Sequence, residues 1–230
     1  MRFLSLFTGI GGMDLGLERA GWTCVGQCEI DPYCRRVLDK HWPNVPKHDD
    51  VCTINPLDFM PFDAIVGGFP CQDVSNAGLR AGISAPRSGL YRELVRCLRV
   101  ARPRIAVLEN VAALLTRGMG TVLGDLAEIG YDAEWDCLPA SAVGAPHKRD
   151  RVFIVANSER NKQPRQEPCG RTLGRMGRLI QSVPWDRPWQ VALAEIRGMD
   201  DGFPRSVERT DALRNAVVPQ VAEVIGRSIL

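Results

Sequence analysis

Short runs of apolar residues alternate along the chain with stretches in which apolar residues recur every three to four positions. The short runs are typical of buried strands, and the second kind is typical of helices with one buried face. The predicted strands cover residues 3–7, 23–28, 63–66, 105–108, 131–138 and 151–156. The predicted helices cover residues 13–20, 33–42, 90–101, 119–129 and 216–229. Asp31 and Pro32 indicate a helix start and Gly21 a helix stop, which supports two of these boundaries.

This alternation predicts stacked strand–helix–strand units. We therefore expect an α/β fold with a Rossmann-like, mostly parallel sheet and helices on both of its faces. Ligands of such sheets lie beyond the carboxyl ends of the strands. The groups of unusual residues that follow a predicted strand are Gly9–Gly12, Glu29, Pro70–Cys71 and Glu109–Asn110.

Residues 158–213 break the pattern, since they are rich in Arg, Gln, Pro, Gly and Trp and show little periodicity. We therefore predict three parts. An α/β domain covers residues 1–157, a small irregular region covers 158–213, and a C-terminal helix at 214–230 returns to the α/β domain. Residues 72–89 are rich in Gly and Ser, which predicts a long loop within the first part.

The composition is that of a globular protein, because 45% of the 230 residues are apolar and 24% are charged. No apolar run approaches the ~18 residues that cross a membrane, and the apolar start is too short for a signal peptide. The eight cysteines form no CxxC pair and the three histidines lie far apart. We therefore expect reduced thiols in a cytoplasmic protein, without a metal site and without membrane attachment.

The net charge of +2 is unevenly distributed. Residues 1–64 hold six Lys or Arg and nine Asp or Glu, whereas residues 147–190 hold ten Lys or Arg and four Asp or Glu. This asymmetry indicates that the C-terminal half faces a polyanion. A solvated basic surface is the alternative.

Residues 7–12, Phe-Thr-Gly-Ile-Gly-Gly, predict a glycine-rich turn between a strand and a helix, where the backbone can approach a ligand closely. Glu29 stands twenty residues after Gly9, at the end of the second strand. A carboxylate at this place can accept hydrogen bonds from ribose hydroxyls. Together these features predict an adenosine-containing cofactor, and NAD, FAD and S-adenosylmethionine all fit. A tight turn without a ligand is the alternative.

Three further features carry candidate chemistry. Cys71 stands between a strand and the long loop, where partial exposure favours a reactive thiolate over a buried structural cysteine. Glu109 follows four apolar residues, so burial would raise its pKa and let it act as an acid; an acid at a helix N-terminus is the alternative. Arg149 and Arg151 stand two residues apart at a strand start and would point to one side as a fork for a phosphate or a base carbonyl. A solvated charge run is the alternative for this pair.

Taken together, these stretches resemble the cytosine-C5 DNA methyltransferase family. The resemblance covers residues 3–157 and 214–226 and rests on six ordered motifs. They are Phe-Thr-Gly-Ile-Gly-Gly at 7–12, Glu29, Gly-Gly-Phe-Pro-Cys-Gln at 67–72, Glu-Asn-Val at 109–111, Lys-Arg-Asp-Arg-Val-Phe at 148–153 and Asn-Ala-Val-Val-Pro at 215–219. Two positions depart from the family pattern, since His147 replaces the usual Gln and Arg214 the usual Gly.

The resemblance implies a class I methyltransferase fold with S-adenosylmethionine as cofactor. Glu29 would bind the ribose hydroxyls, Phe7 and Ile30 the two faces of the adenine, and Asp50 the adenine amine. The other residues that would line the cofactor are Gly9, Ile10, Gly11, Gly12, Pro70, Leu90, Asn215 and Val217.

The same resemblance implies methyl transfer to C5 of a cytosine that is flipped out of duplex DNA. Cys71 would attack C6 as the nucleophile, and Glu109 would stabilise the ring through N3. Arg149 and Arg151 would hold the base O2 and the loop that closes over the base. Residues 72–89 would form that loop.

Residues 158–213 would recognise the target sequence, although this region is short for that role. Its basic residues stand at 160, 162, 165, 171, 175 and 178, and Trp185 and Trp189 would form a small core. We expect a monomer that acts on double-stranded DNA in a restriction-modification or phage setting, which would pair it with a cognate restriction endonuclease. A tRNA methyltransferase of the same family, a non-enzymatic DNA-binding relative and a dinucleotide oxidoreductase are the alternatives.

Overall fold

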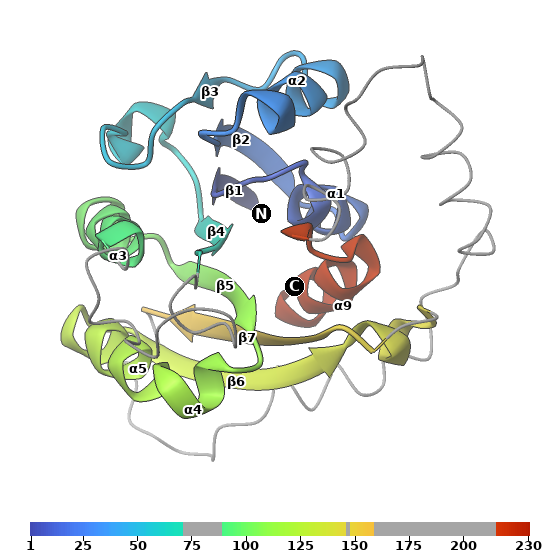
Figure 1. Cartoon of the computed structure of the whole chain (residues 1–230). Helices are drawn as coiled ribbons and strands as arrows, with labels where there is room; N and C mark the ends of the chain where they lie inside the picture. Colours follow the sequence, from blue (N-terminus) through green and yellow to red (C-terminus); the bar gives the residue numbers. More distant parts are fainter. Residues whose placement is uncertain (71–88, 146–147, 159–214) are drawn as a thin grey trace.

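Figure 1 shows the computed structural model of the chain, which describes residues 1–70, 89–145, 148–158 and 215–230. Several predicted features lie outside the described residues and stay predictions: Cys71, His147, Arg214, the loop at 72–88 and residues 159–213 of the irregular region. The proposed division into three parts stays a prediction for the same reason. In the described parts of the chain, no helix has the length and apolar character needed to cross a lipid bilayer.

Seven strands of the described residues form one sheet. They are β1 (Arg2–Leu6), β2 (Thr23–Cys28), β3 (Lys47–His48), β4 (Ala64–Gly68), β5 (Ile105–Val111), β6 (Asp132–Pro139) and β7 (Asp150–Asn157). Their order is β3-β2-β1-β4-β5-β7-β6. The pairs from β3 to β5 are parallel, whereas β7 is antiparallel to both β5 and β6. The predicted α/β class with a mostly parallel sheet is therefore confirmed.

Helices cover both faces of this sheet (Figure 1). Their bounds are α1 (Gly12–Arg19), α2 (Pro32–His41), α3 (Gly89–Ala101), α4 (Leu114–Arg117), α5 (Met119–Glu128) and α9 (Pro219–Ile229), with short 3-10 helices at η1 (Pro56–Phe59) and η4 (Ala140–Val143). On one face, Leu4 of β1 shares a hydrophobic core with Leu94 of α3. On the other, Phe3 of β1 shares a core with Leu17 of α1 and Ile225 of α9. Alternate side chains of β1 thus face opposite cores, as the pleat of a strand requires.

Most of the predicted elements are confirmed. α2 begins where the sequence indicates, because Asp31 Oδ1 accepts hydrogen bonds from the Tyr33 and Cys34 N–H groups at 2.7 and 3.2 Å and Pro32 opens the helix. The pattern does not predict β3, α4 or the 3-10 helices. These elements span two to four residues, which is too short to show a period.

One predicted strand boundary at the candidate site is wrong. β5 continues to Val111, so Glu109 and Asn110 lie inside the strand instead of after it. The extension is stabilised by pairing with antiparallel β7, in which Arg151 stands opposite Val111. β7 begins one residue after Arg149, so this arginine precedes the strand.

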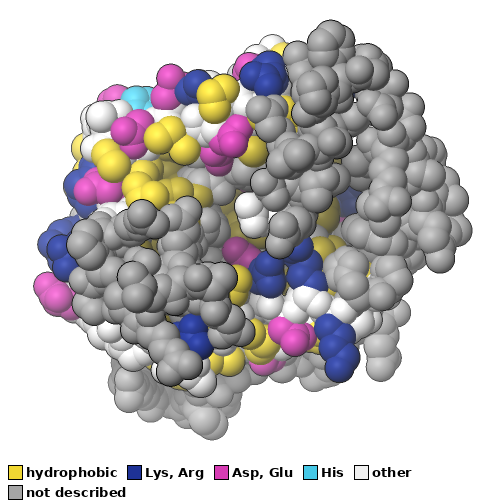
Figure 2. Space-filling model, viewed as in Figure 1, with side chains coloured by type: hydrophobic (Ala, Val, Ile, Leu, Met, Phe, Trp, Pro, Cys, Tyr) yellow, Lys and Arg dark blue, Asp and Glu magenta, His cyan; other side chains and the backbone are white. Residues whose placement is uncertain are grey.

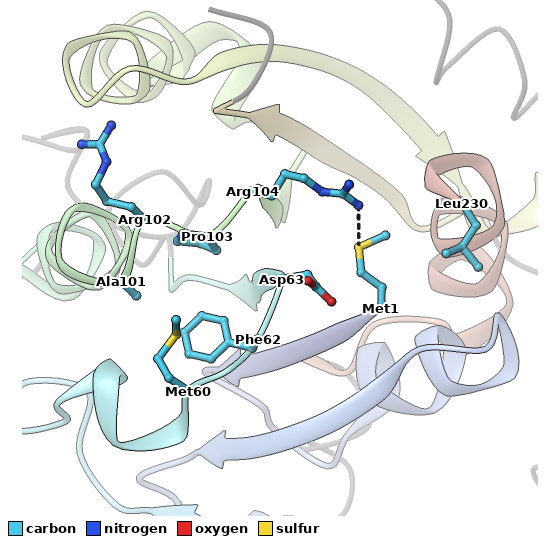
Figure 3. A pocket seen from close by; sticks show the side chains of 9 residues that line it. All are labelled: Met1, Met60, Phe62, Asp63, Ala101, Arg102, Pro103, Arg104 and Leu230. Atoms are coloured by element: carbon cyan, nitrogen blue, oxygen red, sulfur yellow. Dashed lines mark hydrogen bonds between the residues drawn. The ribbon is translucent and has the colours of Figure 1, made fainter. Parts of the chain in front are cut away.

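A pocket of about 510 Å³ lies at the amino ends of the strands (Figure 3). Among its lining residues, Met1 precedes β1, Asp63 precedes β4 and Arg104 precedes β5. The predicted site residues stand at the other ends of these strands, where parallel sheets bind their ligands. This pocket is therefore separate from the candidate active site.

Candidate active site

The glycine-rich turn joins β1 to α1. Its backbone is left-handed at Phe7 (φ 54°), Gly9 (φ 58°) and Gly11 (φ 83°), a conformation that is strained for residues other than glycine. Gly12 approaches the C-terminal segment so closely that a Cβ atom there would lie 2.2 Å from the carbonyl oxygen of Val217. Glycine at this position therefore brings together two stretches that were predicted to line the cofactor.

Glu29 connects the end of β2 to this turn. Its Oε2 accepts a hydrogen bond from the Gly9 N–H at 2.7 Å, and its Oε1 accepts one from the Asp31 N–H at 2.8 Å. A carboxylate offers about four acceptor positions, so both oxygens can still accept hydroxyl donors. Ile30, the next residue, has 68% of its surface exposed, which offers an apolar contact to a flat ring.

The strand order places further predicted cofactor residues at the same edge. β3 lies beside β2 and β4 lies beside β1, so Asp50 after β3 and Pro70 after β4 flank the turn. Asp50 Oδ1 accepts a hydrogen bond from the Cys52 N–H at 2.9 Å, and bonding to Cys52 holds the pKa of Asp50 below its usual value. The remaining predicted lining residues are half-buried or exposed: Ile10, Leu90 and Asn215.

Glu109 is a buried carboxyl group in β5, with 8% of its surface exposed. Its Oε1 lies 2.9 Å from Nε of Arg151 on the neighbouring strand β7. Burial raises the pKa of Glu109 to about 7, although the positive charges of Arg151 and Arg149 oppose this shift. A carboxyl group with this pKa can carry a proton at neutral pH and donate a hydrogen bond. The alternative of an acid at a helix N-terminus is wrong, because the residue lies within a strand.

The two arginines contact different partners. Arg151 pairs with Glu109, whereas Arg149 has a φ of 39° and donates from Nη2 to the carbonyl oxygen of Ala216. Arg149 lies just outside β7, so the strand alternation that predicted a shared side does not apply to it, and the shared side stays a prediction. Both guanidinium groups still lower the pKa of Glu109, so both lie near its carboxyl group.

Charged side chains of both signs meet on the face drawn in Figure 2. Lys and Arg side chains lie next to an Asp or Glu side chain near the middle of this face, with hydrophobic side chains beside them. Basic groups that converge on one face favour an anionic ligand.

Comparison with known proteins decides the family. A sequence model of C-5 cytosine-specific DNA methylases matches residues 1–176. This chain belongs to the C-5 cytosine-specific DNA methylase family. The Bacillus subtilis Type II methyltransferase M2.BsuMI is 37% identical over 165 residues, which are 68% of this chain and 42% of the relative. The Neisseria gonorrhoeae Type II methyltransferase M.NgoBI is 36% identical over 160 residues, which are 68% of this chain and 50% of the relative. The chain thus spans half or less of the length of these relatives.

Solved structures agree in fold. The Entamoeba histolytica methyltransferase EhMeth superposes with a TM-score of 0.61 at 18% identity and covers 73% of this chain and 55% of its own. The S. pombe Dnmt2 methyltransferase superposes with a TM-score of 0.58 at 15% identity and covers 100% of this chain and 96% of its own. At these identities the likeness shows the methyltransferase fold alone.

Two residues of the candidate site carry no chemical signal in the sequence apart from their place in the motifs. Asn110 donates from Nδ2 to the carbonyl oxygen of Phe69 at 3.0 Å, and Phe69 stands two residues before Cys71. Asn110 therefore holds the segment that leads to the predicted nucleophile. Gly68 faces the acid, since a Cβ atom there would lie 2.7 Å from Oε2 of Glu109.

The cysteines that the structure describes are poorly suited to nucleophilic attack. Burial raises the pKa of Cys28 and Cys34 to about 12 and that of Cys97 to about 11, which disfavours the thiolate. Within the described ranges, no group of three or more His, Cys, Asp and Glu side chains could hold a metal ion.

Proposed function

We propose that this protein transfers a methyl group from S-adenosylmethionine to C5 of a cytosine in duplex DNA. The observation that carries this proposal is the buried acid of β5. Glu109 has a pKa of about 7, is bound by Arg151, and lies next to Asn110, which holds the segment that leads to Cys71. An acid that is protonated near neutral pH, together with a thiol nucleophile such as Cys71, is what attack on a cytosine ring requires.

The carboxyl ends of β1 and β2 fit S-adenosylmethionine. Glu29 retains acceptor positions for two ribose hydroxyls, and Ile30 exposes an apolar side chain for one face of the adenine. When bound, the cofactor supplies an electrophilic methyl group. The residues that would complete its site are Phe7, Gly9, Ile10, Gly11, Gly12, Asp50, Pro70, Leu90, Asn215 and Val217.

Cys71 would activate the base. C5 of cytosine is a weak nucleophile until the Cys71 thiolate forms a bond to C6, which places the electrons of the former C5–C6 double bond at C5. C5 would then form a bond to the methyl carbon, while the S–CH3 bond breaks and its electron pair stays on the sulfur of the cofactor. Loss of the C5 proton returns an electron pair to the ring, and the C6–sulfur bond breaks.

Glu109 would stabilise the ring during this addition. In its protonated form it donates a hydrogen bond to N3, where negative charge develops as the thiolate adds. Arg151 binds Oε1, which leaves Oε2 to carry the proton. Arg149 and Arg151 would hold the base O2 and the loop at 72–89. The base must leave the duplex first, at a cost of a few kcal/mol.

Duplex DNA as the substrate is supported by the relatives, which are named Type II methyltransferases. The name also supports a restriction-modification setting, with a cognate restriction endonuclease as partner. Residues 1–157 would bind the cofactor and catalyse the reaction, and residues 158–213 would recognise the target through their basic side chains. We further propose that the protein acts as a monomer in the cytoplasm.

The test compares the wild type with Cys71→Ser and with Cys52→Ser, which changes an exposed cysteine. Labelled methyl transfer is measured on duplex DNA and on tRNA, and duplex with 5-fluorocytosine at the target is used to trap an adduct. We expect transfer to duplex DNA and a trapped adduct with the wild type and Cys52→Ser only. Cofactor affinity of Cys71→Ser should stay within about a few-fold of the wild type, since the thiol lies outside the proposed cofactor contacts. Transfer by Cys71→Ser at a normal rate would refute the mechanism, and transfer to tRNA alone would refute the substrate.

A further inference from the structure

Asp14, in the first turn of α1, is a fully buried carboxylate that the proposed mechanism does not use. Its Oδ1 accepts a hydrogen bond from the Ser5 hydroxyl at 2.7 Å, and its Oδ2 accepts one from Nε2 of Gln27 at 2.8 Å. The Cys24 thiol lies 3.7 Å from Oδ2. One carboxylate therefore connects α1 to the strands β1 and β2.

A charge at this position is costly for the fold. The side chains that hydrogen-bond to Asp14 in the described residues are uncharged, and a buried carboxylate without a cation is destabilising. Burial raises the pKa of Asp14 from 3.8 to about 6, the hydrogen bonds of Ser5 and Gln27 oppose this shift, and the charge of Glu18 adds to it. Stability alone therefore does not account for an acidic residue here.

The hydrogen-bond chain continues from this carboxylate into the glycine-rich turn. Thr8 Oγ1 lies 3.1 Å from Ser5 Oγ, and the Thr8 N–H donates to the carbonyl oxygen of Cys28 at 3.2 Å. The next residue is Gly9, whose N–H is bound by Glu29. This series of hydrogen bonds thus ends at the glycine-rich turn and Glu29, the two features that are proposed to hold the cofactor.

We propose that Asp14 is a positioning residue for S-adenosylmethionine, whose ionised carboxylate holds Ser5 and Thr8 in the arrangement that lets the glycine-rich turn bind the cofactor. This inference rests on the proposed cofactor site. The two donors that face Asp14 explain why ionisation matters. Both carboxylate oxygens accept, so a proton on either one competes with the donor already there.

Protonation changes the hydrogen bonding of whichever oxygen takes the proton, by reversing the bond at Oδ1 or by rearranging Gln27 at Oδ2. On Oδ1, the new O–H must donate to Ser5 Oγ, and the Ser5 hydroxyl then turns away from Asp14. On Oδ2, the O–H needs the carbonyl of Gln27, whose Oε1 is buried without a hydrogen-bond partner among the described residues. The Gln27 amide then flips, and its Nε2 loses its acceptor.

Folding and cofactor binding should respond to pH in opposite directions. Because the pKa of Asp14 in the fold, about 6, lies above the ordinary 3.8, its protonation favours the folded state, and this contribution is lost as pH rises through about 6. Cofactor affinity should instead fall as pH decreases through the same range. The other titratable groups that act on Asp14 are Glu18 of α1 and Cys24 of β2. Burial raises the pKa of Cys24 far above this range, so Glu18→Gln serves as the control for the pH profile.

The experiment measures S-adenosylmethionine affinity by calorimetry on the full chain from about pH 5 to 8, with thermal unfolding in parallel. Asp14→Asn keeps the shape and removes the charge. It should unfold at the wild-type temperature or above, bind the cofactor about tenfold more weakly at pH 7.5, which is ~1.4 kcal/mol, and lose the pH dependence near 6. Ser5→Ala keeps the carboxylate but removes the link to Thr8, and it should weaken binding in the same direction. Glu223→Gln makes the same chemical change at a buried carboxylate of α9 that pairs with Arg227, and it should bind as the wild type does.

The outcomes separate this inference from the proposed function. Wild-type affinity in both Asp14→Asn and Ser5→Ala overturns the inference and leaves the proposed function intact. A loss of affinity in Asp14→Asn that only follows a lower unfolding temperature assigns the residue to the fold and also overturns it. Absence of S-adenosylmethionine binding by the wild type at every pH refutes the proposed function instead.

Discussion

Gly68→Ala should separate catalysis from folding and from cofactor binding. A Cβ atom at Gly68 would lie 2.7 Å from Oε2 of Glu109, whereas ordinary contacts begin at 3.4 Å, so about 0.7 Å must be gained by movement. Gly68 and Glu109 are directly paired across β4 and β5. The backbones of both residues are held by the sheet, so the carboxyl group is the part that moves.

The magnitude follows from where that carboxyl group is held. Arg151 holds Oε1 of Glu109 at 2.9 Å. A displacement of Oε2 therefore moves the proton-carrying oxygen out of the place from which it would contact the cytosine. A misplacement of ~1 Å costs about 10²-fold in rate, so we expect a loss of roughly tenfold to a hundredfold in methyl transfer. Overpacking costs ~1–3 kcal/mol, and replacing glycine by alanine in a strand returns ~0.5–1 kcal/mol, so the variant should remain folded.

The assay is single-turnover methyl transfer on duplex DNA, with cofactor affinity and thermal unfolding measured on the same protein. Gly124→Ala is the matched control, because a Cβ atom at Gly124 has no atom within 4 Å. We expect Gly68→Ala to keep wild-type cofactor affinity and to lose rate, and Gly124→Ala to keep both. A wild-type rate in Gly68→Ala would contradict the assignment of Glu109 as the acid, because displacing the carboxyl group of the acid must slow the reaction.

Three further predictions concern the proposed site. The pKa of Glu109 is raised to about 7 and its protonated form is the active one, so wild-type methyl transfer should decrease as pH rises above about 7. Glu109→Gln should be slower by on the order of 10²-fold and insensitive to pH in that range. A wild-type rate that increases steadily through pH 7 to 9 would contradict this role. The same raised pKa means that Glu109 favours folding below about pH 4.5 and that this contribution is lost as pH rises through about 7, so Glu109→Gln should flatten the stability profile in this window. Glu29→Ala removes an acceptor for ribose and for Gly9 and should weaken cofactor binding by ~2–3 kcal/mol in calorimetry; unchanged affinity would remove Glu29 from the site.

The fold class could be predicted from the amino-acid sequence, which also indicated where to look for a site. Apolar spacing separates strands from helices locally, and the alternation of the two permits little other than a mostly parallel sheet. Local chemistry also set some boundaries, such as the start of α2, where Asp31 bonds N–H groups only two and three residues away. The ordered motifs indicated the family, and the match to residues 1–176 confirms it.

The contacts among the candidate site residues depend on packing between distant parts of the chain. The end of β5 depends on its pairing with β7, which carries the strand past Glu109 to Val111, and no local preference predicts that extension. Arg149 donates to a carbonyl group 67 positions away, a partner that a spacing of two residues cannot indicate. The role proposed for Asp14 also depends on packing between distant parts of the chain. Its charge is ordinary in a sequence, and it becomes costly and consequential only because the packing of α1 on β1 and β2 removes it from water and leaves Ser5 and Gln27 as its partners.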